Sequence, residues 1–276
     1  PLVILPRFSP SKFWPAVKEN NVTLFYVLGT MPLLLMKQER NAELEQNHRL
    51  RLVICSGIVP QLHEVFEKRW NVSWREVYGS TESGGDLWIP LDDEKSVGSG
   101  SVGVPWPTKE AKIIDEDGKE VPNGVIGELV VRGEPMFQGY WKKPKATAEA
   151  FSGEWRHTGD LFYKDEKGYF YITGRLKDMI RRSDENIASA EVEGVLIEYD
   201  KIKMAAVVAV PDELRGEEVK AFVVLQEGES QETVPPEVIV EFAKKKLAYF
   251  KVPRYIEYVD DLPRTPSERI EKHKLI

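Results

Sequence analysis

The sequence has very little cysteine and no long uninterrupted apolar run. Cys55 is the only cysteine among 276 residues, so no disulfide can form within the chain, and a reducing compartment fits best. The longest apolar stretch, from 22 to 36, is broken by Gly29 and Pro32 and is shorter than the roughly 20 residues that a membrane-spanning helix needs. We therefore expect a cytoplasmic protein without a transmembrane segment.

Positive charge is also scarce. Lys and Arg number 38 against 45 Asp and Glu, which gives a formal net charge of −7. The one basic run, Lys244-Lys245-Lys246, is short. A solvated helix face is its favoured interpretation, and contact with a phosphorylated ligand is the alternative. Because nucleic acids require a concentrated basic surface, we expect no nucleic-acid partner.

The sequence also has neither an initiator methionine nor a charged-then-apolar signal region at Pro1. Its start therefore resembles the middle of a larger protein. With 276 residues, of which 42% are apolar, the chain is long enough for more than one core, since single cores stop growing at roughly 250 to 300 residues. We expect two domains.

The apolar pattern changes twice along the chain. Alternating helix and strand predict an α/β region over about 1–85, and short β runs between glycines and prolines predict a barrel-like β subdomain over about 86–174. A last pattern predicts a small α+β domain over 175–276. The expected strands are 53–55, 72–78, 111–114, 127–131, 169–173, 204–210, 219–225 and 255–259, and the expected helices are 61–70, 189–199 and 236–247.

Four short motifs follow one another in a fixed order. They are Tyr78-Gly79-Ser80-Thr81-Glu82, His157-Thr158-Gly159-Asp160, Gly174-Arg175-Leu176-Lys177-Asp178 and Pro263-Arg264-Thr265-Pro266-Ser267. Each motif alone is weak. In this order and at these separations they resemble the AMP-forming adenylate enzyme superfamily, which includes acyl-CoA synthetases, peptide-synthetase adenylation domains and luciferases. The string from Ile180 to Ile187 is most similar to crotonobetaine/carnitine-type acid–CoA ligases.

The resemblance covers essentially the whole chain and implies a fold. It corresponds to the C-terminal half of such an enzyme. The α/β and β-barrel portion of the large AMP-binding domain would occupy 1–174, and the small mobile C-terminal domain would occupy 175–276.

The first motif has the groups that adenylation needs. The reaction joins a carboxylate to the α-phosphate of ATP and releases pyrophosphate, so positioned donors and a metal are required. The resemblance implies that Tyr78, Gly79, Ser80 and Thr81 bind the nucleotide and that Glu82 reaches magnesium. An ordinary polar turn is the less favoured alternative.

Further nucleotide contacts follow from spacing. The Asp160 carboxylate can accept both ribose hydroxyls, and Ile172 and Arg175 lie 12 and 15 positions later, as in the family positions that cover adenine and contact ribose or phosphate. Gly57 and Ile58 occupy the family's adenine-flanking segment. His157 is either a donor near the acyl carboxylate or, preferably, a structural histidine.

Glycines between 97 and 107 imitate a phosphate-binding loop. Gly100-Ser101-Val102-Gly103-Val104-Pro105 nevertheless resembles a structural turn of the family. We interpret this segment as part of the architecture.

In the small domain, the resemblance places Lys177 at the hinge about which this domain rotates. It also implies that Asp184, Glu185 and Asn186 line the CoA tunnel, with Asp184 where glycine is usual. A solvated charged loop is the alternative for these three residues.

The catalytic lysine of the family is replaced here by Arg269, after Glu268 in place of glycine. Arginine keeps the positive charge, but its planar fork differs from an ammonium group. Loss of one preorganised donor can cost on the order of 3 kcal/mol in barrier. Lys272 is a possible substitute, so three alternatives stay open: Arg269 acts, Lys272 acts, or the first half-reaction is crippled.

No segment matches the family's Ser/Thr/Gly-rich loop that cradles the β- and γ-phosphates. We therefore expect that the N-terminal half of the enzyme is needed and that the chain alone is inactive. The expected function is that of an AMP-forming acid–CoA ligase, with a small carboxylic acid, ATP (bound as ATP or AMP), Mg²⁺ and CoA. The alternatives are a catalytically silent homologue that binds nucleotide or acyl-adenylate, and adenylation with a non-CoA acceptor.

Overall fold

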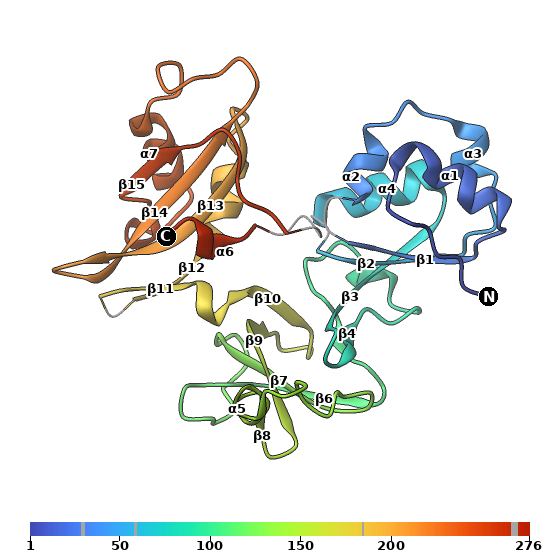
Figure 1. Cartoon of the computed structure of the whole chain (residues 1–276), viewed down its shortest axis with the longest axis horizontal. Helices are drawn as coiled ribbons and strands as arrows, with labels where there is room; N and C mark the ends of the chain where they lie inside the picture. Colours follow the sequence, from blue (N-terminus) through green and yellow to red (C-terminus); the bar gives the residue numbers. More distant parts are fainter. Residues whose placement is uncertain (29–30, 58–59, 184, 266–269) are drawn as a thin grey trace. The chain divides into compact units, whose positions relative to one another are not determined.

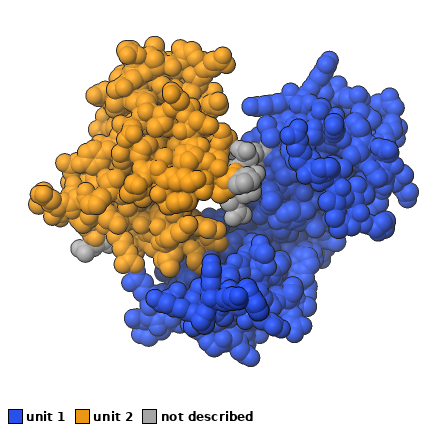
Figure 2. Space-filling model, in the orientation of Figure 1, with its two compact units in different colours: residues 1–158, 162–172 blue, residues 159–161, 173–276 orange. Residues whose placement is uncertain are grey.

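The computed structural model describes residues 1–28, 31–57, 60–183, 185–265 and 270–276. The chain divides into two compact units. The first comprises 1–158 and 162–172, and the second comprises 159–161 and 173–276 (Figure 2). Their sheets confirm the predicted succession of an α/β part, a β-rich part and a final α+β part (Figure 1).

The first sheet has the strand order β1-β2-β3-β4-β5. The first three strands are parallel and the last two pairings are antiparallel. Helices α1 to α4 gather on one side of these parallel strands (Figure 1). The elements are α1 (Pro10–Glu19), β1 (Leu24–Leu28), α2 (Met31–Met36), α3 (Ala42–Gln46), β2 (Leu52–Ser56), α4 (His63–Trp70), β3 (Ser73–Ser80), β4 (Gly84–Trp88) and β5 (Val104–Pro105).

Large aromatic side chains fill the space between the helices and this sheet. Phe66 and Trp70 of α4 stack at 5.2 Å between ring centroids, and Trp70 stacks on Trp74 of β3 at 5.4 Å. All three are fully buried, and each such side chain contributes on the order of 1.5–3 kcal/mol. The predicted helix 61–70 is confirmed, but Pro60–Leu62 form a 3₁₀ turn, so that α4 begins at His63.

The second sheet has the order β10-β9-β7-β6, with β8 paired to β9. It confirms the predicted runs at 111–114, 127–131 and 169–173. The elements are the 3₁₀ turn η2 (Glu94–Ser96), β6 (Lys109–Ile114), β7 (Gly127–Gly133), α5 (Pro144–Glu149), β8 (Phe151–Ser152), β9 (Trp155–Lys164) and β10 (Phe170–Arg175).

The glycine-containing segment before this sheet is architectural, as predicted. The Ser101 hydroxyl donates to the Phe170 carbonyl at 3.1 Å and accepts the Gly103 N–H at 2.8 Å. Gly103 has φ +95°, and a Cβ there would lie 1.8 Å from the Trp88 carbonyl oxygen. Only glycine fits this position.

We expect Gly103→Ala to destabilise the first unit by about 1–3 kcal/mol more than Gly118→Ala does. Gly118 is the matched control because its φ is +78° but no atom of the described residues lies within 4 Å of the position that an added Cβ would take. The difference therefore isolates the clash with the backbone from the strain of positive φ. Urea unfolding of the two variants measures it, and equal losses of stability would contradict this account.

The third sheet has the order β12-β11-β14-β13, with β15 parallel to β14. It packs on two helices around an aliphatic core that includes Ile180, Leu196, Val207, Val223 and Ile239. The elements are the 3₁₀ turn η3 (Leu176–Asp178), β11 (Met179–Arg182), β12 (Glu185–Ala188), α6 (Ser189–Ile197), β13 (Ile202–Asp212), β14 (Gly216–Leu225), α7 (Pro236–Lys244), η4 (Tyr249–Lys251), β15 (Tyr255–Tyr258) and η5 (Lys272–Lys274). The predicted elements are confirmed, with both helices ending slightly earlier.

Over the described part of the chain, no helix combines the length and the apolar character needed to cross a membrane.

Candidate functional site

The motif from Tyr78 to Glu82 lies where β3 turns back into β4. Tyr78 is buried, edge-on to Phe162 with ring centroids 4.9 Å apart, and Thr81 is exposed at the turn. A Cβ on Gly79 would lie 1.9 Å from the Gly84 carbonyl oxygen. Glycine is therefore required at position 79 because the backbone of β4 passes close to it.

Glu82 is the acidic end of the motif and has partners from distant parts of the first unit. The Tyr140 hydroxyl donates to Glu82 Oε1 at 3.0 Å, and Arg156 Nη2 lies 3.8 Å from Oε2. Partial burial raises the pKa of the Glu82 carboxyl. Its own backbone N–H, the hydroxyls of Tyr140 and Ser80, and Arg156 outweigh burial and lower that pKa below its ordinary value. The site therefore holds an ionised carboxylate at neutral pH.

A buried polar network supports the turn from behind. Ser80 and Ser83 share a hydroxyl contact at 3.0 Å, and Ser83 donates to Asp86 Oδ2 at 2.5 Å. Lys109 Nζ lies 3.7 Å from Asp86 Oδ1, with both side chains fully buried. Burial raises the pKa of Asp86 and lowers that of Lys109. The network fixes the turn from inside the β-rich part of the first unit.

Tyr140, Arg156 and this network were not predicted from the sequence. Tyr140 is 58 residues from Glu82 in the chain, so only tertiary structure brings them together. Arg156 is buried, and its Nε and Nη1 have no hydrogen-bond partner within the described structure. The only feature of the sequence that could have pointed to Arg156 is its position directly before His157, the first residue of the second motif.

Asp160 and Arg175 meet on the neighbouring strands β9 and β10, at residues that belong to the second unit. Arg175 Nε lies 3.0 Å from Asp160 Oδ1, and the Asp160 side chain is only 9% exposed. The two side chains thus form an ion pair, with one cationic and one anionic group side by side. Ile172, earlier on β10, is 46% exposed.

Gly57 directly follows β2 and has φ +74°, and its N–H donates to Glu76 Oε1 at 2.7 Å. Ile58, Asp184 and Arg269 lie outside the described residues.

His157 has both ring nitrogens engaged in contacts, Nδ1 with Glu128 and Nε2 with Ser152, each at 2.8 Å. This double engagement favours the structural interpretation of His157 over a role as donor to substrate.

In the small domain, Lys177 lies exposed in η3, between β10 and β11. Glu185 and Asn186 are exposed on β12, opposite Arg182 and Arg181 of β11. Lys177 thus lies at a boundary between elements, and Glu185 and Asn186 lie in the hairpin of β11 and β12. A hinge and a surface for an extended ligand are both compatible with such places.

Lys272 is held tightly within the small domain. Its ammonium group lies 2.7 Å from Glu193 Oε1 and donates to the Ser189 hydroxyl at 2.7 Å, with Asp178 at 3.9 Å. Lys272 and Glu193 are each 16% exposed. Burial raises the pKa of Glu193, and Lys272 opposes that rise. The ammonium group is therefore committed to an internal ion pair.

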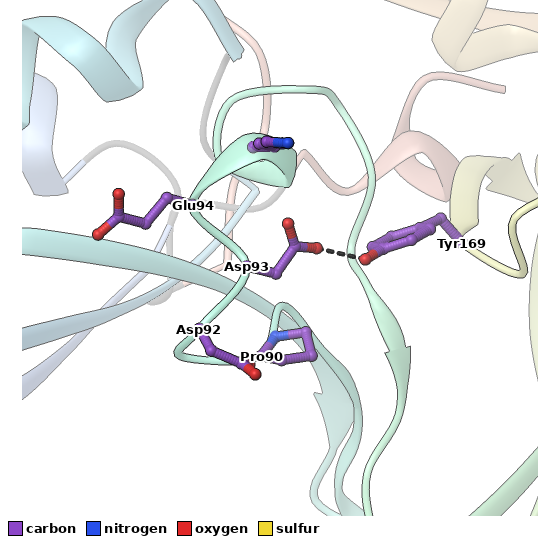
Figure 3. A pocket seen from close by; sticks show the side chains of 6 residues that line it. Pro90, Asp92, Asp93, Glu94 and Tyr169 are labelled. Atoms are coloured by element: carbon purple, nitrogen blue, oxygen red, sulfur yellow. Dashed lines mark hydrogen bonds between the residues drawn. The ribbon is translucent and has the colours of Figure 1, made fainter.

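An open hollow of about 590 Å³ lies elsewhere in the first unit, beside η2 (Figure 3). The Tyr169 hydroxyl donates to Asp93 across it, and Glu94 points away from that pair (Figure 3). None of the predicted site residues that the structure describes lines it. Asp92, Asp93 and Glu94 line it together with Lys95, and this excess of negative charge disfavours phosphate groups.

Comparisons with known proteins agree over nearly the whole chain. The family profile of the AMP-binding enzyme matches residues 1–141, and that of the AMP-binding enzyme C-terminal domain matches 191–269. The crotonobetaine/carnitine–CoA ligase of Proteus mirabilis is 35% identical over 278 residues, which cover 99% of this chain and 53% of that protein. The chain thus spans about half the length of the curated relatives it matches.

Solved structures show the same fold. ATP-bound MatB from Rhodopseudomonas palustris is 30% identical with a TM-score of 0.86, over 99% of this chain and 53% of that one. The amide bond synthetase McbA from Marinactinospora thermotolerans is 31% identical with a TM-score of 0.83, over 98% and 56%. The resemblance first indicated by four short motifs is confirmed, and the chain belongs to the AMP-binding enzyme family, whose members include AMP-forming CoA ligases.

Proposed function

We propose that this chain acts as the C-terminal half of an AMP-forming acid–CoA ligase. The reaction activates a carboxylic acid with ATP to an acyl-adenylate and pyrophosphate, and then transfers the acyl group to CoA. The observation that carries the proposal is the Tyr78–Glu82 turn, with an exposed hydroxyl and an ionised carboxylate, in a chain 35% identical to a CoA ligase. The other half supplies the loop for the β- and γ-phosphates, and we propose that the chain is inactive without it.

The nucleotide is assigned to the two motif regions. Thr81 donates its exposed hydroxyl to the α-phosphate, and Tyr78, Gly79 and Ser80 shape the turn that receives AMP. The Asp160 carboxylate accepts the ribose hydroxyls, while Arg175, whose Nε lies 3.0 Å from Asp160 Oδ1, holds its orientation. Ile172 covers adenine with its exposed side chain, and Gly57 and Ile58 flank the ring.

Mg²⁺ fits the donor set at Glu82. Its carboxylate is ionised, half-buried and fixed on one side by Tyr140, and the Thr81 hydroxyl is adjacent in sequence. Such hard oxygen ligands are those that Mg²⁺ prefers. When bound, the ion neutralises charge on the phosphate oxygens.

We assign the role of the family's catalytic lysine to Arg269 rather than Lys272. Lys272 would have to leave Glu193 uncompensated inside the small domain before it could reach a substrate. Arginine at 269 keeps the required charge and offers a fork that can contact a carboxylate and a phosphate together.

CoA is the proposed acceptor. In this proposal, rotation about Lys177 brings Asp184, Glu185 and Asn186 to the pantetheine arm. An amine acceptor is a second candidate, favoured by the similarity to an amide bond synthetase. A silent nucleotide-binding homologue is the third, since Arg269 replaces the usual lysine.

Mass spectrometry of reactions with ATP, Mg²⁺, CoA and a panel of carboxylic acids tests the acceptor. The protein used should carry both halves. Acyl-CoA formation supports the proposal. Pyrophosphate release without CoA consumption, together with amide formation from added amines, would favour the second candidate, and nucleotide binding without any product would favour the silent homologue.

Tyr140→Phe is expected to raise the Mg²⁺ concentration for half-maximal pyrophosphate release about 10-fold, the lower end of the effect of losing an outer-shell partner. The change removes the hydroxyl bonded to Glu82 but keeps the ring, which packs on Phe137 at 4.9 Å. Tyr171→Phe is the control, because its hydroxyl bonds to Asp165 instead. An Mg²⁺ requirement equal in both variants would contradict the role of Tyr140.

A further inference from the structure

Three metal-ligating side chains of different types meet inside the first unit. Cys55 ends the buried part of β2, Glu76 lies directly opposite it on the parallel strand β3, and His63 is the first residue of α4. Their exposures are 0%, 6% and 4%. Because Cys55 and Glu76 are register partners, their side chains share the sheet face that α4 covers.

The ligand atoms have separations close to those of a shared metal. His63 Nε2 lies 3.3 Å and Cys55 Sγ lies 3.1 Å from the same atom, Glu76 Oε2. All three ligand atoms lie within 4.8 Å of one another. Ligands bound about 2.0–2.3 Å from one zinc ion at tetrahedral angles lie roughly 3.3–3.8 Å apart. Small side-chain rotations therefore suffice to place all three around one ion.

The second carboxylate oxygen is already held. Gly57 N–H donates to Glu76 Oε1 at 2.7 Å, which orients Oε2 toward Cys55 and His63. Such outer hydrogen bonds are the usual support of a metal-ligating carboxylate. His63 Nδ1 has no hydrogen-bond partner within the described structure, so no contact there fixes the ring tautomer, and Nε2 can be the unprotonated ligand nitrogen.

Charge also favours a dication. Within the described residues, His63 is the only basic side chain with a nitrogen within 4 Å of the buried Glu76 carboxylate oxygens. A divalent ion would balance one carboxylate and one thiolate. Binding would form the metal–sulfur bond and release the thiol proton to solvent.

We propose that Cys55, His63 and Glu76 are three ligands of a zinc-type site. The site would join β2 to β3, with Cys55 two residues before Gly57 and Glu76 two residues before Tyr78. Its role would be to hold the starts of two nucleotide-binding segments at a fixed separation. This proposal stands apart from the ligase reaction, since it concerns metal affinity and not turnover.

The chain's single cysteine makes the test specific. Titration of the 276-residue chain with Co²⁺, a spectroscopic substitute for Zn²⁺, should give one equivalent of binding and a sulfur-to-cobalt charge-transfer band in the near ultraviolet. Zn²⁺ should abolish the band by competition. Any such band must arise from Cys55, because no other thiol is present.

Cys55→Ala should eliminate the band, and His63→Ala and Glu76→Gln should weaken Co²⁺ binding at least 10- to 100-fold, the range known even for outer-shell partners. His273→Ala, at an exposed histidine, should change nothing. If a variant does not fold, the proposal can be tested by thermal unfolding of the unaltered chain. Zn²⁺ should raise the midpoint temperature of unfolding, and a chelator should reverse that rise. Absence of the band in the unaltered chain, or its persistence in Cys55→Ala, overturns the proposal.

Discussion

Lys272→Met is expected to destabilise the small domain by about 3–5 kcal/mol, the usual cost of removing one partner from a buried ion pair. The substitution keeps a chain of similar length but leaves Glu193 without its counter-charge. Among the described residues, the Val207 N–H, at 2.7 Å, would then be the hydrogen-bond donor left to Glu193. Urea unfolding followed by circular dichroism measures the loss.

The effect of Lys272→Met should depend on pH in a defined direction. Burial raises the folded-state pKa of Glu193 above 4.5, and Lys272 opposes this rise. Removing the lysine raises that pKa further, so the variant loses stability as pH increases from about 4.5 toward its new folded-state value. The destabilisation should therefore be largest near neutral pH and should shrink as pH falls below about 4.5, where Glu193 becomes protonated in both states.

Lys274→Met is the matched control, because its partner Glu271 is three residues away and Lys274 is 52% exposed. Such surface pairs are worth about 0–1 kcal/mol. Combining Lys272→Met with Glu193→Leu should recover much of the lost stability, since neither charge is then buried. Full stability of Lys272→Met together with loss of adenylation would contradict our assignment and make Lys272 the catalytic cation.

Glu82→Gln should lower acid-dependent pyrophosphate release about 10²- to 10³-fold in the protein that carries both halves. Glutamine keeps the size of the side chain and can still accept from the Tyr140 hydroxyl at the amide oxygen. It lacks the negative charge that the surroundings of Glu82 maintain by lowering its pKa. Initial rates at saturating acid and several Mg²⁺ concentrations measure the loss.

Glu149→Gln is the control for the Glu82 experiment, because Glu149 is 65% exposed and pairs only loosely with Lys145 at 3.8 Å. It should leave the rate within about twofold. Unfolding curves of both variants show whether the fold is intact. A folded Glu82→Gln protein that releases pyrophosphate at the control rate would remove Glu82 from the proposed metal site.

Much of the fold was predictable because its elements have strong local signals. Apolar spacing predicted the helix that ends at Trp70, since Phe66 and Trp70 must face the sheet together. Pro60 indicated approximately where this helix begins. Residues Pro60–Leu62 form a 3₁₀ turn instead of the first α-helical turn, and packing decides such differences at helix ends. Gly103 was predicted as structural, and the 1.8 Å approach to Trp88 gives the reason.

The candidate site was predictable only where its residues are neighbours in sequence. Thr81 and Glu82 belong to one short motif, but Tyr140 and Arg156 come from other strands and loops, and no local pattern links them to Glu82. Lys272 shows the opposite case. Its place three residues after Arg269 suggested a substitute cation, whereas its real partners, Ser189 and Glu193, are about 80 residues earlier and determine its environment.

The most direct test of the proposed function is pyrophosphate release by the protein carrying both halves, measured with ATP and Mg²⁺ across a panel of carboxylic acids, with Arg269→Ala alongside. We predict release that depends on particular acids and falls about 10²-fold in Arg269→Ala. Measurable ATP binding without release for any acid would contradict the ligase proposal and identify the protein as a silent nucleotide-binding member of its family.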